Sequence, residues 1–531
     1  MKIFKIILLN LLILTSLVAS NLQTDSQELL SNSFSKKEKA ILNLTKNYKD
    51  NEKLEVLLQK LLGGDLYYTK SDKRVVFLKE KKAKEYLTVD VFTNNQLEIA
   101  SKYDFKKVKI NNKLRNIIKA SLAKINLFSR NEDKRLSSAK NLLKYLKIED
   151  KELIVEALES EKSSNVRDVL DEANTILIAK YGSDKEKYEA VDKLGSFISS
   201  KTLVTLKDVL KNSKDEKLKE IAKSSLDIVE LKKSFYSFVE TAFFGLSMGS
   251  VLLLAAIGLA ITFGVMKVIN MAHGELIMIG AYTTYTIQQL MPGLIEYSVI
   301  IAIPAAFVVS GIVGILIERL VIRHLYGRPL ETLLATFGVS LILQQLVRTI
   351  YSPLNQEVKT PSWMSGAWEV NSALFLTYNR LYIVVFSVMV FLAILYVMKK
   401  TSLGLKVRAV SQNRPIARAM GIKSSFIDAA TFGIGSGIAG VAGVALSQLT
   451  NVGPNLGQAY IVDSFMVVVF GGVGNLWGTL IAALTLGEIN KFIEPISGAV
   501  LAKVIILVFI ILFIQKRPRG LFPQKGRDAQ D

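Results

Sequence analysis

Hydrophobic and polar positions divide the chain into two halves of different character. Up to about residue 235, apolar residues recur at helical spacing among many lysines and glutamates, which is typical of amphipathic helices. From about residue 240 the apolar runs become long and almost free of charge, as helices that cross a bilayer require. The pattern predicts a soluble module followed by a membrane module.

The second half contains a series of apolar segments. They lie near 242–268, 274–290, 297–317, 331–351, 381–398, 425–447, 460–472, 476–490 and 497–514. The seventh and eighth are short and are joined by "FGGVGNLWG" (470–478), so they are either two tilted spans or a re-entrant hairpin. We expect an all-α, polytopic transmembrane domain of eight or nine apolar segments over residues 236–515.

The first residues have the pattern of a secretory signal peptide. "MKIFK" carries two lysines, "IILLNLLILTSLV" is a short apolar core, and small residues follow at positions 18–20. We expect residues 1–20 to be this signal, whether or not it is cleaved. An uncleaved anchor is the alternative, and either interpretation places residues 21–235 on the outer, periplasmic side.

The soluble half reads mainly as helix, with a small β element. Helical periodicity covers 23–62 and resumes near Asn112, whereas 65–100 is rich in β-branched and aromatic residues between turn-like "SDK" and "NN". "EDKRLSSAKNLLKYL" (132–146) resembles "SDKEKYEAVDKLGSF" (183–197), and two further pairs of segments align at a similar offset. This predicts a HEAT- or armadillo-like helical array, with an irregular bundle as the alternative.

Charge indicates how the membrane half is oriented. The net charge is +20, and the basic residues of this half gather in the loops 318–330 and 399–424 and in the tail 516–531. Basic loops remain in the cytoplasm, so these three segments are expected inside. In the soluble half, lysines alternate with acids along helical text, which is typical of solvated helix faces and argues against a nucleic-acid partner.

Several kinds of chemistry find no support. Without cysteine, thiol catalysis and disulfides are excluded, and the two histidines stand far apart, so a metal site is unsupported. No G-x-x-x-x-G-K-[ST] motif occurs, so we expect no ATPase site and no cofactor in this chain. Gly435, Gly437 and Gly440 form a literal G-x-G-x-x-G, but inside an apolar span small residues serve helix packing.

The loop 399–424 is the first candidate site. It is long, basic and partly helical, and a loop of this length between two spans is expected to do more than connect them. We expect a short helix that docks on a cytosolic partner; the alternative is a basic anchor that only sets topology. The candidate residues are Arg408, Ala409, Asn413, Arg414, Ala417, Arg418, Ala419, Gly421 and Ile422.

The second candidate is "INMAHGE" (269–275), which lies between two apolar segments. Topology makes it a tight inner turn in which Asn270 caps the next helix and Glu275 occupies its first turn. The alternative is that Asn270, His273 and Glu275 line an inner gate or pathway, with Gln344 and Gln345 of the fourth apolar segment. Asp428, Asp463 and Glu488 are further polar residues near apolar text.

Four motifs in order resemble the permease subunits of branched-chain amino acid ABC importers. These are "GLSMGSVLLLAAIGLAITFGVMKVINMAHGELIMIGAYTTY", "GLKVRAVSQNRPIARAMGI", "DSFMVVVFGGVGNLWGTLIAALTLGE" and "KRPRGLF", which together cover about 240–522. The extension before them, with "GDLYYT" and "INNKLRNIIKASLAKINLFSRNEDKRLSSAKNL", is similar to the urea-transporter branch of that family.

The resemblance implies an all-helical permease of the bacterial inner membrane that works with several partners. These are a second, related permease chain, two cytosolic ATPase subunits that bind ATP and magnesium, and a periplasmic solute-binding protein. It also makes 399–424 the segment coupled to an ATPase. We expect uptake of urea or a related small amide. Branched-chain amino acids are the alternative solute; a sensory receptor and a stand-alone channel or carrier are alternatives of other classes.

Overall fold

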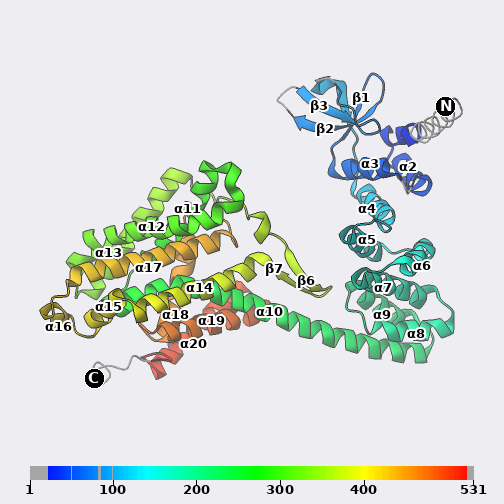
Figure 1. The fold of residues 1–531 in the computed structure, drawn as a ribbon. Helices are drawn as coiled ribbons and strands as arrows, with labels where there is room; N and C mark the ends of the chain where they lie inside the picture. Colours follow the sequence, from blue (N-terminus) through cyan, green and yellow to red (C-terminus); the bar gives the residue numbers. More distant parts are fainter. Residues whose placement is uncertain (1–21, 49–50, 82–84, 98–99, 523–531) are drawn as a thin grey trace, which may run out of the picture. The chain divides into compact units, whose positions relative to one another are not determined.

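The computed structural model describes residues 22–48, 51–81, 85–97 and 100–522. The expected signal peptide, residues 1–20, and the end of the expected basic tail, residues 523–531, lie outside these ranges. The chain divides into two compact units, Met1–Lys232 and Lys233–Asp531 (Figure 1).

The first unit begins with short helices and a small sheet. Its elements are η1 (Ser26–Leu30), α2 (Phe34–Asn47), α3 (Glu52–Gly63), β1 (Leu66–Thr69), β2 (Val75–Lys81), β3 (Glu85–Asp90), β4 (Ala100–Ser101), η2 (Lys102–Asp104) and β5 (Phe105–Lys107). The strands form an antiparallel sheet in the order β4-β3-β2-β1-β5, in the region where the sequence period changes. Leu54, Leu57, Leu58 and Leu61 line one face of α3 and are fully buried in the core that this helix shares with Leu66 of β1.

The rest of the first unit is helical. Its elements are α4 (Asn112–Asn126), α5 (Glu132–Lys144), η3 (Ile148–Asp150), α6 (Lys151–Ser160), α7 (Ser164–Tyr181), α8 (Asp184–Leu194) and α9 (Ser200–Asn212). One apolar core runs from Leu127 to Val229 through these helices. The segments that align in sequence coincide with α5, α6 and α7 and then with α8, α9 and the start of α10. A HEAT- or armadillo-like array stays a prediction.

The helix α10 (Glu216–Met266) runs through the division between the two units. The boundary expected at residues 235 and 236 therefore falls inside one continuous helix of 51 residues. The sequence changes there from charged to apolar, but no proline interrupts it. The helix therefore continues from the charged segment into the apolar segment.

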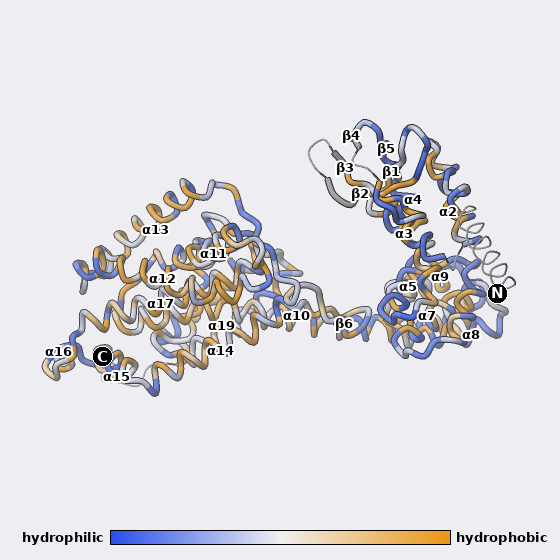
Figure 2. Tube along the Cα trace, turned by 45° about the horizontal axis from the view of Figure 1, so that its top comes forward, coloured by the Kyte–Doolittle hydropathy of each residue, from blue (hydrophilic) through white to orange (hydrophobic). Residues whose placement is uncertain are grey.

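The second unit is a bundle of apolar helices. Its elements are α11 (His273–Leu290), η4 (Pro292–Tyr297), α12 (Ser298–Leu320), η5 (Ile322–Leu325), α13 (Pro329–Tyr351), η6 (Ser362–Met364), β6 (Ala367–Asn371), β7 (Leu374–Thr377), α14 (Tyr378–Lys400), α15 (Ser402–Gln412), α16 (Arg414–Ala419), α17 (Ser424–Ser447), α18 (Leu456–Gly471), α19 (Leu476–Ser497) and α20 (Ala499–Lys516). Figure 2 shows hydrophobic colour along α12, α13 and α14.

Six helices of the described ranges are long and apolar enough to cross a membrane. They are α10, the stretch Pro292–Leu320 that contains α12, α13, α14, α17 and α20. The helix α18 is apolar but shorter, and α11 and α19 are helical without belonging to these six. Each of the nine apolar segments in the sequence thus contains a helix, whereas the number of spans, eight or nine, stays a prediction.

The centre of the bundle is α17, which packs against α11 and α12 and is buried along most of its length. Its glycines allow this close packing: an added Cβ at Gly437 would lie 2.7 Å from the ring of Phe307 on α12. At Gly280 of α11, an added Cβ would overlap the carbonyl oxygen of Gly440. The G-x-G-x-x-G text is therefore a helix-packing motif, as the sequence predicts.

The hairpin β6–β7 is an element that the sequence reading missed. Its strands pair antiparallel, with Ala367 opposite Thr377 and Trp368 opposite Leu376. Strands of five and four residues are too short for alternation to stand out beside the long apolar runs around them.

Candidate functional site

Three of the predicted residues lie together, buried where α10 ends and α11 begins. Asn270, His273 and Glu275 are each 1% exposed. The ring nitrogen Nε2 of His273 lies 2.9 Å from the carbonyl oxygen of Ala255, so this histidine ties the start of α11 to α10. Asn270 does not cap α11 as expected. The helix begins only at His273, and the Asn270 Oδ1 instead accepts from the amide of Ala272 at 3.0 Å.

Glu275 contacts a helix far away in the sequence, α13. Its Oε1 accepts from Ser340 Oγ at 2.9 Å and from Gln344 Nε2 at 2.7 Å. Its other oxygen, Oε2, is buried and has no hydrogen-bond partner among the described residues. Of the two glutamines singled out in the sequence, Gln344 contacts Glu275, whereas Gln345 does not. Consecutive helix residues point about 100° apart, and Gln345 is exposed.

The contacts between α11 and α13 keep a constant register. Met271 N donates to Thr336 Oγ1 at 3.1 Å, Glu275 accepts from Ser340, and Thr286 Oγ1 lies 2.7 Å from the hydroxyl of Tyr351. Each of these pairs is 65 residues apart in the sequence. The two helices therefore run in the same direction, side by side. We call this contact the α11–α13 seam.

Aromatic rings close the far end of the α11–α13 seam. The ring centroids of Tyr282 and Tyr351 are 4.8 Å apart, and those of Tyr285 and Tyr351 are 6.0 Å apart. The hydroxyl of Tyr282 is buried and has no hydrogen-bond partner in the part of the chain that the structure describes. The seam therefore has a carboxylate near one end and a tyrosine cluster at the other, with the buried side chains of Met278 and Val347 between them.

The sequence reading missed Thr336 and Ser340, although a signal was present. Thr332, Thr336, Ser340 and Gln344 follow one another at intervals of four residues on an otherwise apolar helix, and all four are buried. An interval of four places side chains on one helix face. Polar residues at this spacing in a membrane-type helix predict a polar stripe turned toward the bundle.

The loop 399–424 forms two short helices, α15 and α16. Asn413 begins α16, and its Oδ1 accepts from the amide of Ile416 at 3.0 Å. Arg414 makes hydrogen bonds of 2.6 and 2.8 Å to the two carboxylate oxygens of Asp428 at the start of α17. The guanidinium carbon of Arg414 also lies 4.1 Å from the ring centre of Tyr326. These contacts fix α16 against α17 and the α12–α13 connection.

The other predicted residues of this loop divide into anchors and exposed positions. Ala417 is buried, and its carbonyl oxygen accepts from the amide of Ile422 at 3.0 Å. Arg418 donates to Ser424, and Arg408 donates to the carbonyl oxygen of Met398. Ala409 is half-buried, whereas Ala419 and Gly421 are exposed. Ile416 and Met420 are 58% and 77% exposed. The tip of α16 therefore presents small and apolar groups outward.

A chain of contacts joins this loop to the turn between α10 and α11. Ser411 Oγ of α15 donates to the carbonyl oxygen of Gly264 at 3.1 Å, near the end of α10. Close to that same end, Lys267 has a φ of 55°, a left-handed conformation that is uncommon for lysine. A shift of α15 would therefore act on the residues just before Asn270 and His273.

The turn between α18 and α19 lies against the tail of the chain. The amides of Leu521 and Phe522 donate to the carbonyl oxygens of Phe470 and Gly471 at 2.9 and 3.2 Å. Asn475, which begins α19, donates from Nδ2 to the carbonyl oxygen of Phe522 at 3.2 Å. The two motifs "FGGVGNLWG" and "KRPRGLF", which are distant in the sequence, therefore pair through their backbones.

Two further acids lie inside the bundle. Asp463 of α18 pairs with Lys503 of α20 at 2.9 Å, which balances its charge. Glu488 of α19 lies against Gly245 of α10, and its Oε2 is buried without a hydrogen-bond partner. Neither contacts the α11–α13 seam through any hydrogen bond found in the described ranges.

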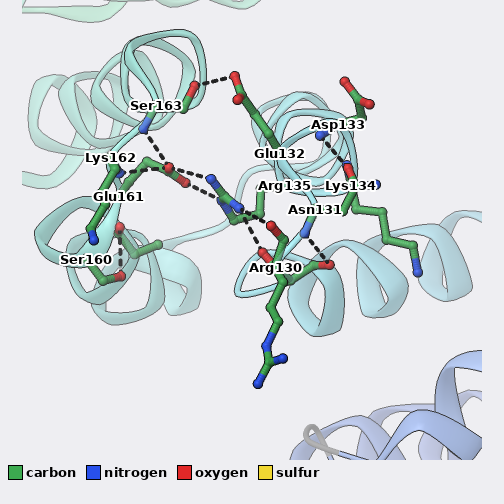
Figure 3. Close-up of polar contacts among 12 residues, drawn as sticks. Arg130, Asn131, Glu132, Asp133, Lys134, Arg135, Ser160, Glu161, Lys162 and Ser163 are labelled. Carbon is green, nitrogen blue, oxygen red and sulfur yellow. Dashed lines mark hydrogen bonds and ion pairs between the residues drawn. The ribbon is translucent and has the colours of Figure 1, made fainter.

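A cavity of about 310 Å³ lies in the first unit, beside an ion pair between Arg135 and Glu161 (Figure 3). Arg135 donates to both carboxylate oxygens of Glu161, at 2.8 and 3.0 Å, and to two backbone oxygens. Glu161 also accepts from the amides of Lys162 and Ser163. Because the charged groups satisfy one another, the pair holds α5 to the α6–α7 connection. No cluster of metal-ligating side chains occurs in the described ranges.

Comparison with known proteins identifies the family of the second unit. Residues 241–514 match the family described as "Branched-chain amino acid transport system / permease component". The high-affinity branched-chain amino acid transport system permease protein LivH of Escherichia coli K12 is 30% identical over 305 residues, which cover 55% of this chain and 97% of LivH. Its counterpart BraD of Pseudomonas aeruginosa is 29% identical over 296 residues, or 54% of this chain and 96% of BraD.

A more distant relative has another named solute. The ribose import permease protein RbsC of Escherichia coli K12 is 25% identical over 245 residues, which cover 41% of this chain and 68% of RbsC. No solved structure matches the chain. The family match covers more than half of the chain and contains both the α11–α13 seam and the loop 399–424. The chain therefore belongs to the family of permease components of branched-chain amino acid transport systems.

Proposed function

We propose that this chain is the membrane-spanning subunit of an ATP-binding cassette importer that carries a branched-chain amino acid across the bacterial inner membrane. The observation that carries this proposal is the alignment with LivH, which covers 97% of that permease. The chain itself performs no hydrolysis in this proposal; energy comes from separate subunits.

The partners follow from the family. We propose a second, homologous permease chain, two cytosolic ATPase subunits that bind ATP and magnesium, and a periplasmic solute-binding protein. The lipid-facing surface is supported by the exposed apolar side chains of α13 and α20, for example Leu341 and Leu512. Residues 21–235 are proposed to be periplasmic and 516–531 cytoplasmic, because the basic loops then lie inside.

The loop 399–424 is proposed to transmit the ATPase motion to the bundle. Its exposed tip, with Ile416, Ala419 and Met420, suits a groove on a cytosolic partner. Arg414 holds this tip to α17, and Ser411 joins α15 to the end of α10. Motion at the tip would thereby reach the start of α11, where we place an inner gate of Asn270, His273, Glu275 and Gln344.

The two halves of the chain favour different solutes. The resemblance of the N-terminal extension favours urea, whereas the family match and the relatives LivH and BraD favour branched-chain amino acids. We propose the latter because these comparisons cover the translocating unit itself. The extension is proposed to contact the solute-binding protein or the partner permease.

Transport in vesicles tests the proposal. The complete complex is reconstituted with its solute-binding protein in liposomes that contain ATP, and uptake of labelled leucine is compared with uptake of labelled urea. ATP-dependent accumulation of leucine is expected. Accumulation of urea alone would transfer the chain to the urea branch, and uptake without any ATPase subunit would contradict the importer proposal altogether.

A further inference from the structure

Glu275 has one oxygen that the protein leaves without a partner. Oε1 accepts two hydrogen bonds, from Ser340 and Gln344, whereas Oε2 is buried and accepts none from any residue within 22–48, 51–81, 85–97 and 100–522. A buried polar atom of this kind is uncommon and calls for an explanation.

The positive charge of Arg348 acts on this carboxylate, but no ion pair joins the two. In the ranges that the structure describes, Glu275 forms no ion pair with a lysine or arginine. Arg348, one turn beyond Gln344, donates instead to Asn455 Oδ1 at 2.8 Å. His273 is engaged with the carbonyl oxygen of Ala255. A buried acid inside a membrane bundle that has no directly paired counter-ion favours a ligand that brings its own positive charge.

The surroundings of Glu275 suit an aliphatic body attached to that charge. Met278 lies one turn further along α11, and Val347 lies one turn beyond Gln344 on α13; both belong to one buried apolar cluster. Tyr282 closes the cluster, and its hydroxyl is also buried without a partner. From Glu275 to Tyr282 the helix rises about 10 Å, roughly the length of one amino acid with its side chain.

We propose that the α11–α13 seam holds the transported amino acid during one step of translocation, with its α-ammonium group on Glu275 Oε2. The ammonium group supplies a positive charge and three donors, which match an unpartnered carboxylate oxygen. The branched aliphatic side chain then lies against Met278 and Val347. A metal ion fits less well, because Glu275 is the single acid at this place among the described residues and no ligand cluster surrounds it.

The seam is closed in this structure, so the solute enters when α13 moves. One face of α13 contacts the bundle through Thr336, Ser340 and Gln344, while Leu334, Leu341 and Ile342 on its other faces are exposed. The helix is therefore restrained mainly along the seam itself. This inference rests on the proposed function, since it takes the solute to be an amino acid.

The first test is the variant Glu275→Gln in the complete complex. The amide oxygen can still accept from Ser340 and Gln344, but the charge at the Oε2 position is lost. Leucine uptake is expected to fall about tenfold or more, with the amount of assembled complex unchanged. The matched control is Gln345→Ala, on the exposed side of α13, which should transport as the unaltered complex does. Uptake by Glu275→Gln within about twofold of the unaltered complex would overturn the inference.

The second test leaves Glu275 intact and uses the absence of native cysteine. Met278→Cys supplies one thiol in the seam, and its labelling by a maleimide is followed during ATP turnover. Leucine and isoamylamine, which both carry an ammonium group, are expected to slow the labelling, whereas isocaproate, which lacks it, is not. Equal protection by all three compounds, or a thiol that is never labelled, would contradict the proposal. If the unaltered complex imports no leucine, the proposed function fails instead.

Discussion

Arg414 and Asp428 join α16 to α17 through two parallel hydrogen bonds of 2.6 and 2.8 Å. The side chains are 13% and 8% exposed, so water competes little for either group. The guanidinium plane also lies over the ring of Tyr326. One arginine therefore sets the position of the exposed tip that we propose to contact an ATPase subunit.

The variant Arg414→Lys tests that role. Lysine keeps the charge but loses the two parallel hydrogen bonds to Asp428 and the stacking on Tyr326. The contacts that hold α16 in place should therefore weaken by about 2 kcal/mol. ATP-dependent solute uptake should fall by about tenfold while the protein still inserts in the membrane. Arg323→Lys, at an exposed position nearby, serves as the control. Normal uptake by Arg414→Lys would remove this arginine from the coupling path.

A charge at the tip of α16 should prevent the proposed contact between this loop and the ATPase subunits. Ala419 is exposed and small, so Ala419→Glu leaves the fold intact but places a carboxylate where a partner surface is expected. We expect uptake to be abolished and the ATPase subunits to be lost on purification. Gln412→Glu places the same charge at another exposed position of the loop and should transport normally. Co-purification with unchanged uptake in Ala419→Glu would contradict the docking proposal.

Packing at the centre of the bundle depends on the approach of α11 to α17. In Gly280→Ala the new methyl group would overlap the carbonyl oxygen of Gly440, so the helices must separate. Overpacking of this kind costs about 1–3 kcal/mol. The midpoint of thermal denaturation in detergent should be lower, and less protein should be recovered on purification. Gly338→Ala on α13 meets nothing within 4 Å and should be as stable as the unaltered protein or slightly more so.

The hydrogen bonds between the tail and the α18–α19 turn can be tested by shortening the chain. Ending the chain after Lys516 removes the hydrogen bonds from Leu521 and Phe522 to Phe470 and Gly471. Two backbone hydrogen bonds contribute about 1–3 kcal/mol together, so the shortened chain should be more sensitive to protease at the turn. Ending it after Phe522 keeps these bonds and should have no effect on the rate of cleavage.

The first unit should lose stability in acid through Glu161. Hydrogen bonds from Arg135 hold the pKa of this carboxyl below its usual range. Because folding lowers the pKa, the stabilisation is complete above the ordinary value of about 4.3. It is lost as the pH falls through the lower, folded value. Proteolysis of α5 and α6 in the full chain should therefore accelerate in that acidic window.

The variant Glu161→Gln is the control for this acid effect. Removing the carboxylate leaves Arg135 without its charge partner, so the unit should be less stable near neutral pH by about 3 kcal/mol. The increase in the rate of proteolysis between neutral and acidic pH should also be smaller in this variant than in the unaltered protein. An unchanged pH profile in Glu161→Gln would assign the acid sensitivity to other carboxylates.

Much of the fold could be predicted because apolar periodicity is strong in both halves. The nine apolar segments each contain a helix, and the packing role of Gly435, Gly437 and Gly440 followed from their apolar surroundings. The continuity of α10 could not be predicted, because a change in composition resembles a boundary even where the backbone continues unbroken.

The candidate site was harder to predict, since its contacts join distant residues. Glu275 and Gln344 were both singled out, but nothing in the text pairs them or distinguishes Gln344 from Gln345. Asp428 was noted as an acid in an apolar helix, and Arg414 as a basic loop residue; that they bind each other required the fold. Ser340 was not singled out at all, because its partner Glu275 lies 65 residues away in the sequence.

The four-residue spacing on α13 has a mechanical consequence. Thr332, Thr336, Ser340 and Gln344 repeat a polar group once per turn, so a slide of α13 by one turn along α11 would bring the next polar group to Glu275 but would remove Tyr351 from Thr286. Glu275 would then face two hydroxyl groups in place of a hydroxyl and an amide. A polar group that recurs about every 6 Å along α13 is what a shear motion of this helix past Glu275 would use.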